Sequence, residues 1–399
     1  KTLAYLLPLS QLIDAGDDEP QAVVVTPGRE LALQSATVLK NMGSGLRAMA
    51  CYGGRATMDE HRVMKQVRPQ IVFGTPGRLN DHLDKGNLNR YHIRYLVIDE
   101  FDKCLEMGFQ DEMSRLVKSL PGLRRHFLLS ATEAEEIPRF VHMGRVEKID
   151  YRMDEEQVPE RVHIYKVESP VKDKLESLGM LLRSLGDQST IVFLNYRDSV
   201  ERTNKYLVEQ GFSTSFFHGG LEQNEREASL YRFSNGSANI LVSTDLASRG
   251  LDIPDIDNII HYHMPESEDG YIHRVGRTAR WEAQGRAFFL LGPEEHIPEY
   301  VDAEVEEYEI PAVEELPMPA KPKMATLYIG KGKKDKISKG DILGFLCKKG
   351  GLNSSEIGKI DVNDRYAYAA IARPKLRSVL NNVKGEKIKG VKTIVEEVR

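Results

Sequence analysis

The chain has 399 residues, of which 41% are hydrophobic and 29% charged, and its formal net charge is −5. This length predicts two or three domains, and no apolar run approaches the ~20 residues of a membrane helix, which excludes a membrane protein and indicates a soluble, cytoplasmic one. Three scattered cysteines, Cys51, Cys104 and Cys347, exclude a disulfide framework or a zinc site.

The first part of the chain alternates short apolar runs with segments long enough for helices. The runs lie at 21–26, 71–75, 95–99 and 126–130. This alternation is typical of a parallel α/β sheet. We therefore expect residues 1–150 to form one such domain, with its active groups at the carboxyl ends of the strands.

The same rhythm restarts after residue 160 and predicts a second α/β domain over 151–297. Its apolar runs lie at 163–167, 190–194, 239–244, 258–263 and 286–291. Between the first two runs, one helical face carries four leucines, which indicates a core helix: Leu175, Leu178, Leu182 and Leu185.

An acidic segment with several prolines follows at 298–322, and we expect a solvated linker there. From residue 320 onward, 19 Lys and Arg stand against 8 Asp and Glu, a net charge of +11. The pattern of this tail is β-α-β-β-α-β, with Ser338 capping the first helix and Pro374 opening the second. A small ferredoxin-like α+β domain is predicted over 323–399.

Two adjacent acids, Asp99 and Glu100, end the apolar run of the strand at 95–99. They cannot both stay ionised in a dry sheet, so they need solvent or a cation. Mg²⁺ with a nucleotide would supply it, because P-loop enzymes hold Mg²⁺ with an Asp after a strand and can use a neighbouring Glu on the attacking water. Taken alone, these residues are equally compatible with a merely acidic strand-to-loop junction.

The first two residues, Lys1 and Thr2, match the end of a phosphate-binding loop, G-x-x-x-x-G-K-[ST]. In such a loop the Lys binds phosphates and the hydroxyl binds Mg²⁺. Two residues are weak evidence by themselves, but they precede an apolar helix and lie one strand unit before the run at 21–26.

Seven motifs in order resemble those of DEAD-box RNA helicases. They are TPGRELALQ (26–34), YGG (52–54), TPGRL (75–79), VIDEFD (97–102), SAT (130–132), STDLASRGLD (243–252) and YIHRVGRTAR (271–280). The resemblance spans 1–292 and is far more specific than any single motif. It implies two RecA-like domains and an RNA-stimulated ATPase that uses ATP and Mg²⁺.

In the first domain the resemblance implies a catalytic set, a coupling set and an RNA set. Asp99 and Glu100 would serve Mg²⁺ and the catalytic water, with Thr2 also at Mg²⁺ and Lys1 on ATP. Coupling to the other domain would use Asp102, Ser130, Ala131 and Thr132. The RNA backbone would be faced by Arg29, Gly53, Gly54, Thr75, Gly77 and Arg78. Such backbone contacts carry no base identity.

In the second domain, Arg274, Arg277 and Arg280 follow one another at spacings of three. The resemblance implies that they face the triphosphate, with Arg277 and Arg280 matching arginine fingers and His273 linking to the acidic motif. Gly250 and Asp252 would contact ATP. RNA-contacting or coupling positions would be Gly219, Arg226, Thr244, Asp245 and Arg249, with Arg197 a weaker candidate and His218 as much structural as functional.

The basic tail predicts nucleic-acid binding. Lysines crowd one loop, at Lys331, Lys333, Lys334 and Lys336. Tyr366 and Tyr368 could stack on bases or be ordinary strand residues, and both interpretations stay open. The stretch 325–362 resembles the RRM-like RNA-binding domain of DbpA-type bacterial helicases, which implies structured ribosomal RNA as the partner during large-subunit assembly. No obligate protein partner is evident.

Three positions depart from the family pattern: Gly28 replaces Thr, Phe101 a small residue and Trp281 a Gly. The rest of the phosphate-binding loop and the adenine-reading segment would precede Lys1, so we expect the chain to be part of a longer enzyme and to bind ATP poorly alone. The alternative is a non-catalytic RNA-binding clamp or ribosome-assembly scaffold. Glu100, Arg277 and Arg280 favour the enzyme.

Overall fold

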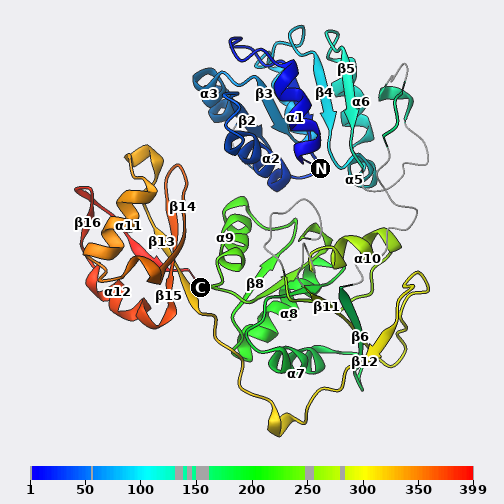
Figure 1. Cartoon of the computed structure of the whole chain (residues 1–399), viewed down its shortest axis with the longest axis vertical. Coiled ribbons are helices and arrows are strands. Elements are labelled where there is room, and N and C mark those ends of the chain that lie inside the picture. The colour runs from blue at the N-terminus through cyan, green and yellow to red at the C-terminus, as the bar shows by residue number, and fades with distance from the viewer. Residues whose placement is uncertain are drawn as a thin grey trace. The chain divides into compact units, whose positions relative to one another are not determined.

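Two units make up the chain in the computed structural model (Figure 1). The first holds residues 1–153 and the second most of the remainder. The structure describes residues 2–54, 57–130, 138–141, 146–149, 161–247, 256–278 and 284–398. None of the helices in these ranges has both the length and the apolar character that crossing a bilayer requires.

The first unit is built on five parallel strands in the order β2-β3-β1-β4-β5. Their bounds are β1 Ala22–Val25, β2 Ala48–Cys51, β3 Ile71–Gly74, β4 Tyr95–Ile98 and β5 Arg125–Leu128. The four predicted strands are confirmed. The sequence AMAC of β2 escaped prediction because its alternate residues are only half-buried and it is short of β-branched residues.

Helices cover both faces of this sheet, so successive strand residues enter two separate cores. Val24, Phe73 and Val97 pack with the first two helices, whereas Val23 and Val72 pack with helices that follow later in the chain. This alternation is the period of two that a strand imposes. The helices are α1 Thr2–Leu12, α2 Arg29–Asn41, α3 Thr57–Val67, α4 Pro76–Asp84, α5 Phe101–Glu106 and α6 Gln110–Lys118, and η1 Arg139–Val141 is a 3-10 turn.

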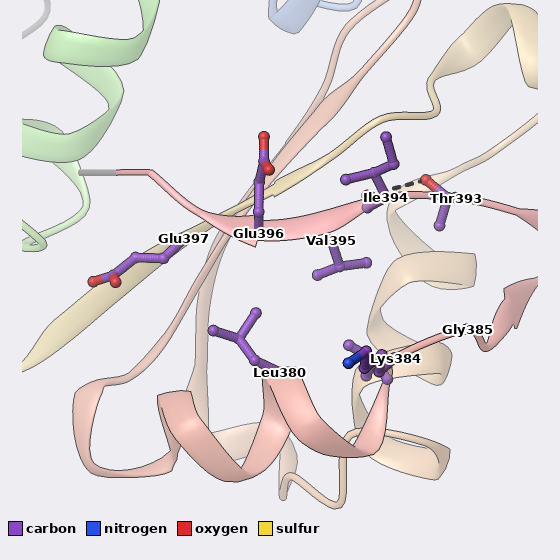
Figure 2. A pocket seen from close by; sticks show the side chains of 9 residues that line it. Leu380, Lys384, Gly385, Thr393, Ile394, Val395, Glu396 and Glu397 are labelled. Carbon is purple, nitrogen blue, oxygen red and sulfur yellow. Dashed lines mark hydrogen bonds between the residues drawn. The ribbon is translucent and has the colours of Figure 1, made fainter.

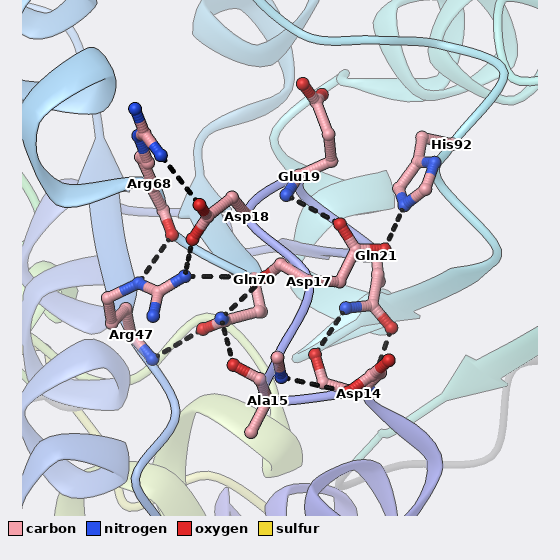
Figure 3. A network of polar contacts seen from close by, with 11 residues as sticks. Asp14, Ala15, Asp17, Asp18, Glu19, Gln21, Arg47, Arg68, Gln70 and His92 are labelled. Atoms are coloured by element: carbon pink, nitrogen blue, oxygen red, sulfur yellow. Dashed lines mark hydrogen bonds and ion pairs between the residues drawn. The ribbon is translucent and has the colours of Figure 1, made fainter.

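A polar network closes the amino ends of these strands (Figure 3). Arg47 and Arg68 both donate to the Asp18 carboxylate at 2.7 Å. Gln70 donates to the Asp17 carbonyl at 2.8 Å, and His92 Nε2 lies 2.6 Å from an Asp17 carboxylate oxygen. The network fixes the loop between α1 and β1.

The second unit begins with a seven-stranded parallel sheet in the order β12-β6-β11-β10-β7-β9-β8. Its strands are β6 Val162–Glu168, β7 Thr190–Phe193, β8 Thr214–Phe217, β9 Ile240–Ser243, β10 Asn258–His261, β11 Gly285–Leu291 and β12 Val305–Glu307. All five predicted strands are confirmed, and β8 and β12 are additional.

The helices of this domain are α7 Leu175–Leu185, α8 Arg197–Glu209, α9 Gln223–Ser234 and α10 Glu268–Val275, with the 3-10 turn η2 Asp245–Ala247 after β9. All four leucines of the predicted stripe on α7 are buried and pack in a core with Val192, Val242 and Leu290. The stripe is therefore core, as predicted.

The acidic segment at 298–322 is mostly exposed, as expected of a linker, but it is attached to the second sheet. Its strand β12 pairs in parallel with β6, and the Tyr308 ring packs edge-on against Phe288 at 5.2 Å. The Arg183 guanidinium donates to the Leu316 carbonyl at 2.6 Å and to the Pro317 carbonyl at 2.7 Å. The backbone of 305–317 thus follows a fixed path, around the 3-10 turn η3 Val313–Glu315.

The tail forms an antiparallel sheet in the order β14-β15-β13-β18, as in a ferredoxin-like fold. Its elements are β13 Met324–Ile329, η4 Lys333–Asp335, α11 Lys339–Lys348, η5 Ser354–Glu356, β14 Ile357–Val362, β15 Ala367–Ala372, η6 Arg373–Lys375, α12 Leu376–Asn382, the hairpin β16 Lys387–Ile388 and β17 Val391–Lys392, and β18 Val395–Glu397. The predicted cap is confirmed, because Ser338 Oγ accepts from the Asp341 amide at 3.2 Å. The predicted fold class is confirmed for all three domains.

Candidate nucleotide and RNA sites

The acid pair lies directly after β4, at the carboxyl edge of the first sheet. Asp99 is 2% exposed, and one of its carboxylate oxygens accepts from the Glu100 amide at 3.0 Å. Glu100 has φ 49° and ψ 54°, the left-handed conformation. For a residue with a side chain this costs about 1–2 kcal/mol. Strain of this kind is typical of functional sites.

The first turn of helix α1 lies near the acid pair. Tyr5 of α1 is buried, and its pKa is raised first by that burial and then by the nearby Asp99 carboxylate. Thr2 stands three residues before Tyr5 on the same helix, so both predicted Mg²⁺ groups, Thr2 and Asp99, lie near this residue. A hydroxyl and a carboxylate are the hard oxygen donors that Mg²⁺ prefers, so these residues fit an ion bound with a nucleotide. Lys1 lies outside the described residues.

The aromatic residue between the acids of the motif faces the interior. Phe101 is 1% exposed and belongs to the core that contains Ile98, Cys104 and Met113. Its amide donates to the Leu129 carbonyl at 2.9 Å, which ties the first turn of α5 to the end of β5. Its role is therefore packing beneath the acid pair.

Of the predicted coupling residues, Asp102 is buried in the first turn of α5. Ser130 is half-buried just beyond β5. Ala131 and Thr132 fall outside the part of the chain that the structure describes.

The predicted RNA residues of the first domain gather on loops after three adjacent strands. Arg29 begins α2, and its guanidinium lies 3.4 Å from where a Cβ of Gly53 would stand. Gly54 has φ 92°. Thr75 occupies the N-cap position of α4 without a side-chain bond to the helix, and nothing lies within 4 Å of the Cβ position of Gly77. The loops thus offer open backbone beside a cation, which suits a phosphate chain.

Arg78 departs from this picture because its side chain points into the domain. It is 11% exposed, its Nε lies 3.3 Å from Glu60 Oε2, and it donates to the Tyr52 carbonyl at 3.2 Å. Glu60 also accepts from the Tyr52 amide at 3.1 Å and lies 2.8 Å from His82 Nε2. In this structure the contacts of Arg78 hold the loop at 52–54 in place, and its place at the RNA backbone stays a prediction.

The same network brings together three residue types that bind metals. Ligand atoms of Cys51, Glu60 and His82 lie within 4.8 Å of one another. The Glu60 carboxylate already has the Arg78 and His82 contacts, and the pKa of the Cys51 thiol is raised by burial and then by Glu60, which disfavours the thiolate that a metal needs. The cluster is a charge network.

The arginines of the second domain separate into two kinds. Arg274 is 0% exposed, and its guanidinium donates to Asp245 at 2.5 Å, to Asn195 at 2.8 Å and to the His263 carbonyl at 2.8 Å. The expectation that it faces a triphosphate is therefore not met. Its partner Asp245, predicted at the RNA, contributes to this ion pair.

Arg277 stands in the turn beyond α10 and is partly exposed. His273 Nδ1 lies 2.8 Å from the Asp269 carbonyl and 3.1 Å from its carboxylate, within the same helix. Thr244 follows β9 and is partly exposed. Four predicted residues of the second domain fall outside the described ranges: Arg249, Gly250, Asp252 and Arg280.

The loop between β8 and α9 contains the remaining predicted residues. Gly219 is exposed, and the guanidinium of Arg197 lies 3.5 Å from its Cβ position. The position of Arg197 at the start of α8, beside Gly219, is compatible with the prediction that it contacts RNA. His218 is 2% exposed and accepts from the Gly220 amide at 3.1 Å, a structural role. Arg226 is 5% exposed and lies over the Phe217 ring at 5.2 Å.

In the C-terminal domain, Lys333 and Lys334 are exposed on η4, and Lys331 is paired with Asp335 at 2.9 Å. The loop packs tightly, because a Cβ on Gly332 would stand 2.2 Å from the Asn363 carbonyl. Only glycine fits there without movement. The exposed ammonium groups are therefore presented on a well-supported turn.

A hollow in the same domain lies between α12 and β18 (Figure 2). Its walls are apolar at Leu380, Val383 and Val395 and charged with both signs at Lys384, Glu396 and Glu397. It contains none of the predicted site residues. Two carboxylates among its lining residues make it unsuited to phosphate.

Three known families match successive parts of the chain. DEAD/DEAH box helicase matches residues 1–140, the helicase conserved C-terminal domain matches 173–282, and the DbpA RNA binding domain matches 326–397.

Similar proteins extend over nearly the whole chain. The ATP-dependent RNA helicase DbpA of Escherichia coli (strain K12) is 35% identical over 401 residues, covering 98% of the chain and 87% of that protein. DbpA of Bacillus subtilis (strain 168) is 31% identical over 420 residues, with the same shares.

Solved structures agree on the two α/β domains. S. cerevisiae Dbp5 bound to RNA and ADP BeF3 has a TM-score of 0.65 at 24% identity, covering 77% of the chain and 82% of that structure. Mss116p bound to ssRNA and AMP-PNP has a TM-score of 0.65 at 25% identity, covering 78% and 69%. At 24% identity, the similarity to Dbp5 shows only that the fold is shared.

Proposed function

Since this chain belongs to the DEAD-box ATP-dependent RNA helicases of the DbpA type, we propose that it separates RNA duplexes locally, by cycles of closing and opening of its two α/β domains that ATP hydrolysis drives. One observation carries this proposal: an acid pair directly after β4, with Glu100 in a strained left-handed conformation. An acid pair at the carboxyl end of a parallel strand suits chemistry on a bound nucleotide, which a protein that only clamps RNA does not need.

The residues divide the chemistry between them. Asp99 and Thr2 would hold Mg²⁺, which supplies positive charge at the phosphates when bound, and Glu100 would orient and deprotonate the attacking water. Arg277 and Arg280 would stabilise the negative charge that develops on the transferred phosphoryl group. Arg274 would hold α10 in place through Asp245.

Closure would couple this chemistry to RNA. If both ligands bind the closed arrangement more tightly, each favours closure by that difference in affinity. Arg29, Thr75 and the glycine loops of the first domain, with Gly219 and Thr244 of the second, would bind the backbone of one strand. Such contacts are independent of sequence. Loss of the γ-phosphate would remove the arginine contacts and reopen the domains.

The C-terminal domain would supply the target. The net charge of +11 from residue 320 onward and the exposed Lys333 and Lys334 suit a structured RNA, and we propose ribosomal RNA during large-subunit assembly. Part of the affinity should then depend on salt, because lysines on phosphates release counterions.

The test of the enzyme is RNA-stimulated ATP hydrolysis, measured with the chain extended before Lys1 by the matching segment of the E. coli relative, so that the phosphate-binding loop is complete. Glu100→Gln keeps the size of the side chain and removes the base. We expect hydrolysis to fall about 10²–10⁴-fold while RNA affinity stays unchanged. Equal rates for the two proteins would refute the proposal and favour the scaffold.

The test of targeting compares the affinity for a ribosomal RNA hairpin with that for an unrelated hairpin of equal length. We expect the double variant Lys333→Glu, Lys334→Glu to lose the preference. A variant with the same charge change elsewhere on the domain, Lys348→Glu, Lys349→Glu, is the matched control. Unchanged preference in the first variant would contradict the role of the η4 loop.

A further inference from the structure

The two central strands of the C-terminal sheet, β13 and β15, are largely buried on both faces, although both helices of this domain pack on one face. Leu327, Ile329 and Ala369 share a core with residues of α11 and α12. Residues that alternate with them point to the other face, which we call the outer face. There Thr326 is 1% exposed and Tyr368 is 7% exposed. Side chains this buried on a face without a helix of their own need a cover from elsewhere.

The cover is α9 of the second α/β domain, which belongs to the same unit. The ring of Tyr231 stacks on that of Tyr368, with centroids 5.0 Å apart. The Tyr366 hydroxyl donates to Glu227 at 2.8 Å, and the Tyr231 hydroxyl donates to the Lys359 carbonyl. Glu227 and Tyr231 are four residues apart and so lie on one face of the helix.

A second group of contacts follows at the end of α9. Asn235 Nδ2 donates to the Thr326 hydroxyl at 2.9 Å, and the Ser237 hydroxyl lies 2.5 Å from the same atom. Arg373 donates to the Ser237 carbonyl at 3.3 Å. Ser237 is 2% exposed. Buried, paired polar groups fix one orientation of the two surfaces, because any other would leave them without partners.

We propose that the outer face is an intramolecular docking surface whose partner is α9, and that RNA reaches this domain at the exposed η4 lysines instead of on the tyrosines. A base can stack only on an open ring face, and the Tyr368 ring is covered by Tyr231. For Tyr368 this contact favours the structural interpretation over base stacking, and the Tyr366 hydroxyl is held by Glu227. The RNA part of the inference rests on the proposed function.

Docking has a consequence for the second domain. The residue before Glu227 on α9 is Arg226, and the helix follows the loop of Gly219. The helix that holds the C-terminal domain therefore begins at a predicted RNA contact. An RNA held at the η4 lysines is then presented to that loop in one geometry and at a high effective concentration.

Docking is tested by hydrogen exchange of the chain without RNA or nucleotide. Tyr231→Asp places a charge against Tyr368, and we expect exchange in α9, β13 and β15 to rise about tenfold or more. Tyr196→Asp, at a tyrosine of the same domain that is 64% exposed, is the matched control and should change nothing there. Unchanged exchange in β13 and β15 with Tyr231→Asp would overturn the docking.

Unfolding of the variant is recognised by α7, which should keep its protection. A milder variant, Tyr366→Phe, removes one hydrogen bond and keeps the ring, and we expect a rise in the exchange of α9 of about threefold. If Tyr231→Asp removes the protection of α7, that variant has unfolded and Tyr366→Phe becomes the test of docking. In that case, an unchanged exchange rate in α9 of Tyr366→Phe would overturn the docking.

The RNA part is tested by affinity for a hairpin and for a single-stranded RNA of equal length. We expect Tyr368→Leu to change both affinities less than twofold, and Lys333→Glu, Lys334→Glu to lower the hairpin affinity about tenfold. A larger loss of hairpin affinity with Tyr368→Leu than with Lys333→Glu, Lys334→Glu would refute the RNA part of the inference. Failure of RNA-stimulated hydrolysis would refute the proposed function and leave the exchange result standing, so the two failures are distinguishable.

Discussion

The two α/β domains use the charged residues of their motifs in opposite ways. In the first, Glu100 follows β4 in a left-handed conformation, so the domain carries backbone strain at a partly exposed acid. In the second, Arg274 is 0% exposed and held by Asp245, so the domain carries a buried ion pair. A motif therefore mixes residues for chemistry with residues that support them, and burial separates the two.

The largest stability effect should come from breaking the buried pair. Arg274→Ala removes three hydrogen-bonded partners, and we expect the second domain to lose about 3 kcal/mol, the low end of the usual range because water can reach Asp245, which is 38% exposed. Because a chain of several domains is not two-state, the measurement is hydrogen exchange of β7 and β10. The control is Arg202→Ala, an exposed pair with Asp173 at 2.5 Å, with an expected loss below about 1 kcal/mol. Equal losses of stability in the two variants would contradict the claim that the buried Arg274 pair stabilises the second domain more than an exposed pair does.

A smaller effect should come from the strain in the first domain. Glu100→Gly and Glu100→Ala both remove the carboxylate, but only glycine adopts φ 49° without cost. We expect the Gly variant to be about 1 kcal/mol more stable than the Ala variant, measured by exchange of β4, with hydrolysis lost in both. A more stable Ala variant would show that Glu100 stores no strain.

The smallest effect should come from pH at the opposite edge of the first sheet. The pKa of Asp17 is lowered from 3.8, first by the Glu19 amide and then by His92. A lowered carboxyl pKa adds stability above the unfolded value, and this stability is lost as pH falls from about 4 through the folded value. Asp17→Asn should flatten the decline of first-domain stability in that window, followed by exchange of β1. An unchanged decline would assign the acid sensitivity to other carboxylates.

Much of the fold could be predicted because buried parallel strands are apolar and β-branched along their whole length. The strand β8, with Thr and Ser among its residues, and β12, within an acidic segment, lack that signal and acquire their pairing from neighbours. The ferredoxin-like order of the tail was predictable because its strands and helices are separated by clear caps and turns.

The candidate sites were predicted less completely, because a motif gives positions and not directions. The spacing of three groups Arg274 with Arg277, but α10 ends at Val275, so Arg277 lies in the turn beyond while Arg274 points inward. Arg78 likewise turns toward Glu60, a partner from another helix that the motif does not contain. The cover of Tyr368 by α9 depends on a contact between domains, which local sequence cannot reveal.

The two bonds of Arg183 shorten the connection between the second sheet and the C-terminal domain. They hold the backbone at Leu316 and Pro317, and Lys321 donates to the Gly211 carbonyl further along, so the span left before β13 is only 318–323. A tether this short leaves the two surfaces little freedom to lose on meeting, since the entropy of closing a loop grows with its length. Lengthening that span is therefore a way to weaken docking without altering any residue of either surface.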